Sequence, residues 1–153
     1  MKKDVSRILV VSRSTRYCQK AVHYGVSLAR KYSAELFVMH VIYDPFSLEG
    51  WNLPVPSLQQ EYENLLRTAR EGIHRIVEAE KVQGLEITET IREGKPVDET
   101  IKMVKKHKID LLIMLAHEEG HLEHFLFGRS NEELIRRMPC SIMLIKKKYS
   151  RIG

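Results

Sequence analysis

The clearest chemical pattern lies at positions 117–121, which read His-Glu-Glu-Gly-His. It fits the zinc-peptidase pattern His-Glu-x-x-His, in which two histidines on one helical face bind zinc and the glutamate activates a water. Because the stretch directly follows an apolar run and contains Gly120, it predicts a loop rather than a helix. We therefore predict no metal site and no metal hydrolase. Incidental metal binding at the surface would use His117, His121 and His124.

Other motifs of catalytic or nucleotide-binding sites are missing from the sequence. It contains no Gly-x-x-x-x-Gly-Lys-Ser/Thr loop, no Gly-x-Gly-x-x-Gly and no Gly-x-Ser-x-Gly. A phosphate-accepting receiver domain needs an acidic cluster near its first strand, where this chain has Arg13. We predict that the protein is not an enzyme.

Length and composition are typical of one globular domain. The 153 residues suit a single hydrophobic core, and 43% hydrophobic with 29% charged residues is ordinary for a soluble protein. No apolar run approaches the length of a membrane span, and the run that follows Met1 is too short for a signal-peptide core. We expect one cytoplasmic domain over residues 1–153.

The net charge of +5 includes a basic tail over residues 146–153. No helix-turn-helix, zinc-finger or aromatic-rich RNA-binding motif accompanies this tail, so we expect it to be solvated and nucleic acid not to be a partner. The two cysteines, Cys18 and Cys140, have no metal-binding spacing, and we expect both to pack as small core hydrophobes.

Strand-like and helix-like patterns alternate along the chain. Short apolar runs predict strands buried on both faces, and a strand with one apolar face is expected over 85–91. Helical spacing predicts a helix over 18–32, a long helix opened by a Ser57–Gln60 capping box, a helix after Pro96, and a last one capped by Ser130 and Glu133. The apolar runs are Ile8–Val11, Leu36–Ile42, Leu111–Leu115 and Ser141–Ile145.

Five strands and four helices in this alternation imply parallel pairing with right-handed crossovers. The predicted fold class is α/β, a doubly wound, open, parallel five-stranded sheet with helices on both faces.

Several stretches in order resemble the universal stress protein family over nearly the whole chain. The opening Ile8–Val11 and the segment Ala34–Val41 are similar to its first third, and Gly94-x-Pro96 followed by Ile109–Met114 is similar to its middle. The closing segment Pro139–Ile145 is similar to its end. The resemblance implies an adenine nucleotide alpha hydrolase-like sheet in the order 3-2-1-4-5. It also implies a homodimer through the last strand and, in some members, ATP at the carboxyl edge of strands one and four.

The family's nucleotide motif, Gly-x2-Gly-x9-Gly-Ser/Thr, falls on Leu115, Glu118, Gly128 and Arg129, so only one of its four positions is kept. The glycines allow backbone to approach phosphate, and Glu118 would repel it. We therefore expect a vestigial nucleotide or anion site, with the candidate residues Arg13, Val41, Gly128, Arg129 and Ser130.

We predict a universal stress protein-like binding or signalling module that acts in the stress response through dimerisation and an unknown protein partner, without a cofactor. The alternative is a member that binds ATP or AMP through a divergent phosphate loop.

Overall fold

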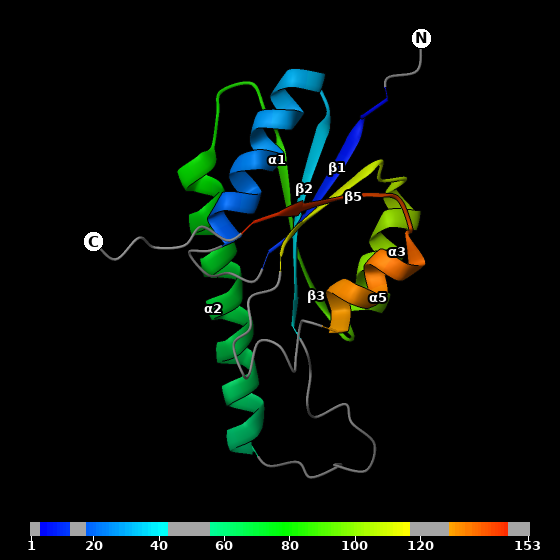
Figure 1. The fold of residues 1–153 in the computed structure, drawn as a ribbon. Coiled ribbons are helices and arrows are strands. Elements are labelled where there is room, and N and C mark those ends of the chain that lie inside the picture. Colours follow the sequence, from blue (N-terminus) through cyan, green and yellow to red (C-terminus); the bar gives the residue numbers. More distant parts are fainter. Residues whose placement is uncertain (1–3, 13–17, 43–55, 117–128, 147–153) are drawn as a thin grey trace, which may run out of the picture.

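The computed structural model describes residues 4–12, 18–42, 56–116 and 129–146, without the side chains of residues 56–58 and 129–130. In these ranges five strands alternate with four helices (Figure 1). The strands are β1 (Arg7–Val11), β2 (Glu35–Ile42), β3 (Ile87–Glu93), β4 (Leu111–Leu115) and β5 (Ser141–Ile145). The helices are α1 (Cys18–Tyr32), α2 (Pro56–Glu80), α3 (Pro96–His107) and α5 (Arg129–Arg137).

All neighbouring strands are parallel, and their order in the sheet is β3-β2-β1-β4-β5. The central strand β1 pairs on both sides, so that Ile8 lies opposite Leu36 of β2 and Leu111 of β4. The predicted fold class and the implied sheet order are confirmed. Because all strands are parallel, their carboxyl ends meet at one edge of the sheet.

Helices cover both faces of the sheet, with α1 and α2 on one side and α3 and α5 on the other (Figure 1). Alternate residues of β1 divide between the two layers: Ile8 and Val10 belong to the core under α1 and α2, and Leu9 belongs to the core under α3 and α5. All three are fully buried. This explains why β1 is a continuous apolar run instead of an alternating one.

Several element boundaries differ from the sequence-based prediction, and three of the differences have a local structural reason. Strand β3 begins at Ile87 and not at Leu85, because the Leu85 N–H donates to the Val82 carbonyl in a turn that has Gly84 at φ +87°. Helix α2 begins at Pro56, one residue before the predicted cap, as suits a proline in a first helical turn. Helix α5 begins at Arg129, so Ser130 lies inside it and is not its cap.

Neither cysteine forms a disulfide, and both pack with apolar residues. Cys18 is buried in the core under α1 and α2, whereas Cys140 is half-buried against the core under α3 and α5. Burial raises the pKa of the Cys140 thiol, against a smaller opposite effect of the Leu112 backbone hydrogen bond. The thiol therefore stays protonated at neutral pH and is a poor nucleophile.

In the part of the chain that is described, none of the helices has the length and apolar character needed to cross a bilayer.

At the amino edge of the sheet, Asp110 links the starts of β4 and β1. Its Oδ2 accepts hydrogen bonds from the backbone N–H groups of Ser6 and Arg7, at 2.8 and 2.9 Å. Each bond to a charged acceptor contributes about 1.5–3 kcal/mol.

We expect Asp110→Ala to lower the free energy of unfolding by about 2–4 kcal/mol in urea denaturation, because two partly buried N–H groups lose their acceptor. Asp110→Asn keeps one acceptor oxygen and should lower the free energy of unfolding clearly less. If both variants lower it equally, the negative charge of Asp110, and not its role as an acceptor, stabilises the protein.

Candidate functional site

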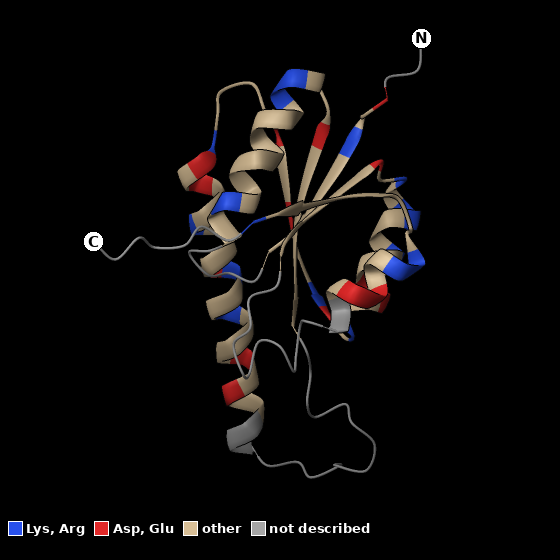
Figure 2. Ribbon diagram, in the orientation of Figure 1, with Lys and Arg blue, Asp and Glu red and all other residues tan. Residues whose placement is uncertain are grey.

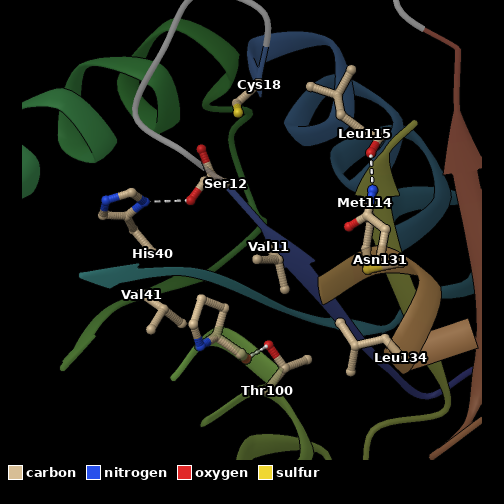
Figure 3. A pocket seen from close by; sticks show the side chains of 11 residues that line it. Val11, Ser12, Cys18, His40, Val41, Thr100, Met114, Leu115, Asn131 and Leu134 are labelled. Carbon is tan, nitrogen blue, oxygen red and sulfur yellow. Dashed lines mark hydrogen bonds between the residues drawn. The ribbon is translucent and has the colours of Figure 1, made fainter. Parts of the chain in front are cut away.

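A pocket opens at the carboxyl edge of the sheet, beside the point where β1 and β4 separate. In a sheet of this order the chain leaves β1 toward one side and enters β4 on the other, which is where open α/β sheets bind ligands. The ends of three strands and the beginnings of three helices surround the pocket. The residues that line it are Val11, Ser12, Cys18, His40, Val41, Pro96, Thr100, Met114, Leu115, Asn131 and Leu134 (Figure 3).

The strand ends bring His40 next to Ser12. The Ser12 N–H donates to the Met39 carbonyl at 2.7 Å, which continues the pairing of β1 and β2 by one residue. The Nδ1 atom of His40 lies 2.6 Å from the Ser12 carbonyl oxygen (Figure 3). Because a carbonyl only accepts, Nδ1 must carry the proton and donate it. This bond orients the imidazole at the rim of the pocket and holds the ends of β1 and β2 together.

The helix beginnings contribute two further polar side chains, and both are bonded to the chain's own carbonyls. The Thr100 hydroxyl of α3 is buried and donates to the Pro96 carbonyl at 2.6 Å, within the first turns of its helix. The Asn131 Nδ2 of α5 donates to the Leu115 carbonyl at 3.0 Å, which ties the start of α5 to the end of β4 (Figure 3). The donors of these groups therefore position the pocket's own walls.

The described walls of the pocket carry no charged side chain of Asp, Glu, Lys or Arg. The space between the lining residues has a volume of about 40 Å³. These walls thus contain neither a carboxylate to act as general acid or base nor a cation to hold a phosphate.

The residues proposed from the sequence are only partly placed by the structure. Val41 is buried and lines the pocket, and Arg129 and Ser130 form the first turn of α5 directly before Asn131. Arg13 and Gly128, like the histidines at positions 117, 121 and 124, lie outside the described residues. Among the residues that are described, no group of three or more His, Cys, Asp or Glu side chains could hold a metal ion.

Sequence reasoning missed four polar residues of the pocket: Ser12, His40, Thr100 and Asn131. A signal existed for two of them. Ser12 directly follows the apolar run of β1, and His40 is the one polar residue inside the apolar run of β2. Polar residues at the carboxyl ends of parallel strands are candidates for a binding site in this class of fold. Thr100 and Asn131 lie within ordinary helical patterns and gave no comparable signal.

Comparison with known proteins gives a consistent result. The family model described as the Universal stress protein family matches residues 5–146. Universal stress protein MJ0531 of Methanocaldococcus jannaschii is 24% identical over 146 residues, which cover 92% of this chain and 82% of that protein.

Solved structures share the fold. The protein MJ0577 superimposes with a TM-score of 0.74 at 21% identity, covering 95% of this chain and 99% of that one. A universal stress protein solved in complex with cAMP has a TM-score of 0.63 at 17% identity, covering 94% of this chain and 98% of that one.

Proposed function

The chain belongs to the universal stress protein family, and from this premise we propose that it is a non-enzymatic binding module that forms homodimers, engages a protein partner and does not bind ATP. The observation that carries the ATP part of the proposal is the pocket at the sheet's carboxyl edge. Its described walls lack any charged residue, and the side-chain donors of His40, Thr100 and Asn131 are bonded to backbone carbonyls of the same walls. Among these described walls, a triphosphate would find no cation to offset its charge.

The changed motif positions agree with this proposal. Leu115 stands where the family's first glycine lets backbone approach phosphate, and it is the last residue of β4, paired with Ile145 of β5. Its carbonyl already accepts the hydrogen bond from Asn131. Glu118 and Arg129 replace the second glycine and the hydroxyl residue of the motif. Each change adds a side chain or removes a donor at a place where phosphate would need close contact.

The alternative function is binding of an adenine nucleotide with fewer phosphates, such as AMP. It is favoured by the position of the pocket at the switch point and by the apolar wall that includes Val41. One structure with this fold is a complex with cAMP, which makes cyclic and linear monophosphates the ligands to compare with ATP.

Titration calorimetry with ATP and magnesium tests the main claim. We expect no dissociation constant tighter than roughly 10 μM, which corresponds to about 7 kcal/mol. AMP and cAMP are titrated in the same way, and tight binding of either would select the alternative. A Glu118→Gly, Arg129→Ser double variant should gain measurable affinity for ATP if loss of the motif is the cause. Tight ATP binding by the unchanged protein would contradict the proposal.

The dimer proposal rests on the difference between the two edge strands. Strand β3 carries Glu89, Arg92 and Glu93, whereas the five residues of β5 include no charge (Figure 2). Charges on an edge strand prevent pairing with other chains, and an uncharged edge is open to it. Within the described residues, no strand pairs with the outer edge of β5. A two-fold pairing of β5 with its copy would cover this edge.

Exposed apolar side chains extend this edge into a surface. Ile135 of α5, Met138 in the turn after it and Leu144 of β5 are all exposed. Ile135 and Met138 belong to the segment that leads into β5, and burying large apolar side chains in a contact is favourable. We therefore propose that β5, together with these residues, forms the dimer interface, here called the β5 surface.

A further inference from the structure

The outer face of α3 carries a concentration of positive charge. Residues 100–109 contain four lysines and no aspartate or glutamate. Lys105 and Lys106 lie three and four residues after Lys102, and all three lysines are exposed. Because residues at this spacing share one face of a helix, the three side chains form a single row along α3.

The end of α5 extends this row. The Nη1 atom of Arg137 lies 3.8 Å from the Oδ1 atom of Asp98, which belongs to the first turn of α3 and precedes Lys102 by four residues. Figure 2 shows blue residues gathered on the second half of α3 and at the end of α5. We call the exposed row of Lys102, Lys105, Lys106 and Arg137 the α3 stripe. From Asp98 to Lys106 the helix axis advances roughly 12 Å.

Only part of this positive charge is neutralised within the protein. Lys102 and Arg137 each contact an acidic side chain. In the described part of the chain, Lys105 and Lys106 form no ion pair. Both side chains therefore remain available to a negatively charged partner.

Helix stability accounts for these charges only in part. Acidic residues in the first turn and basic residues in the last turn complement the helix dipole, and α3 has both. Lys102, however, lies in the middle of α3, where the dipole effect is lost. Like charges four residues apart repel, so Lys102 and Lys106 work against the stability of the free helix. A negatively charged partner would relieve this repulsion.

We infer that the α3 stripe binds an acidic segment of a protein partner, whose glutamate or aspartate side chains pair with the lysines. This rests on the proposed function in one respect, the existence of a protein partner, and adds the surface and the chemistry of the contact. Charged groups that meet across an interface are complementary in sign, which gives specificity and speeds association.

Nucleic acid fits this surface less well than an acidic protein segment. Proteins that bind single-stranded nucleic acid stack its bases on aromatic side chains. Neither α3 nor α5 contains Phe, Tyr or Trp. The acidic Asp98, which lies on the same face of α3, would also repel phosphate groups.

The α3 stripe is separate from the proposed dimer contact. Helix α3 packs on β1, β2 and α5, and none of its three lysines belongs to the β5 surface. A failure of the α3 stripe can therefore be told apart from a failure of the dimer or of the ATP proposal, which sedimentation and calorimetry measure separately.

Backbone nuclear magnetic resonance on the unchanged protein tests the inference with a defined probe. The probe is a synthetic helical peptide of about 20 residues with glutamates four residues apart on one face, and its counterpart has glutamine at these positions. We expect the acidic peptide to shift signals of α3 and of the end of α5 in a saturable way. The glutamine peptide should leave them in place, and sodium chloride should weaken the acidic peptide's binding, because exposed ion pairs are screened.

A triple variant removes the positive charge of α3. Replacing Lys102, Lys105 and Lys106 together by glutamine should weaken binding of the acidic peptide by roughly tenfold, because each exposed ion pair contributes modestly and three are lost. Glutamine has a similar helix propensity to lysine, so the variant should keep its fold and its melting temperature.

The matched control removes the same amount of charge from α2. It replaces three exposed arginines of that helix by glutamine, and it should bind the acidic peptide like the unchanged protein. The arginines are Arg67, Arg70 and Arg75.

Three results would overturn the inference. Equal loss of affinity in the two triple variants would show that the overall charge is responsible, and peptide-induced shifts confined to other elements would place the contact elsewhere. The third result concerns DNA of similar length, single-stranded or duplex. Binding of this DNA that is tighter than that of the acidic peptide at the same salt concentration, and that is lost in the α3 variant, would assign the α3 stripe to nucleic acid.

Discussion

Replacing Leu144 by Glu should leave the protein monomeric at micromolar concentration. Leu144 is 44% exposed and lies on β5, the edge strand without charges. Burying a leucine stabilises a contact by about 1.5–3 kcal/mol, and a two-fold interface contains the residue twice. The substitution therefore removes about 3–6 kcal/mol from the β5 surface and raises the dimer dissociation constant by a factor of roughly 10² to 10⁴. Sedimentation velocity over a concentration series measures this directly.

Leu65→Glu is the matched control for this experiment. Leu65 has nearly the same exposure, 48%, but lies on α2, away from β5. The variant should remain dimeric, because the same change of charge and surface character occurs outside the proposed interface. A monomeric unchanged protein would contradict the dimer, and a dimeric Leu144→Glu would place the interface on another surface.

The strands were the most predictable part of the molecule. Each buried strand is a short apolar run, since both faces of the sheet are covered, and the bounds predicted for β4 and β5 agree with the structure. The order of the strands in the sheet was not predictable from these apolar runs. Hydrophobic patterns locate strands but do not say which lie side by side, so the order 3-2-1-4-5 depended on resemblance to a family. The start of β3 was misplaced because Leu85 continues the apolar pattern into a turn.

The site was less predictable because its polar contacts join residues far apart in the chain. The His40–Ser12 bond spans 28 residues and the Asn131–Leu115 bond spans 16. The family resemblance led to Val41 and to the start of α5, which border the pocket, but not to the side chains that hold its walls. Such contacts follow from the tertiary arrangement and not from local spacing.

The same arrangement makes one small residue indispensable for the packing of α1. Gly25 is buried on the face of α1 that meets the sheet. A Cβ atom placed there would lie 2.6 Å from the Val10 Cγ2 of β1 and 3.2 Å from the Leu36 Cδ1 of β2. Both neighbours are buried core side chains, and the β-branched valine has little rotamer freedom to move away. The helix can lie this close to the sheet only because position 25 has no side chain.

Gly25→Val should lower the free energy of unfolding by about 3–5 kcal/mol, because three added carbons must displace either core side chains or the helix. Ser27→Val is the control on the exposed face of α1 and should change stability by less than about 0.5 kcal/mol. Urea denaturation followed by circular dichroism measures both.

A cycle of Gly25→Ala and Val10→Ala then isolates the contact, since removing the Val10 methyl groups makes room for the new Cβ. We expect the double variant to be more stable than the sum of the single losses predicts by about 1 kcal/mol or more. Additive losses, or a Gly25→Val protein as stable as Ser27→Val, would show that α1 can move away from the sheet at little cost.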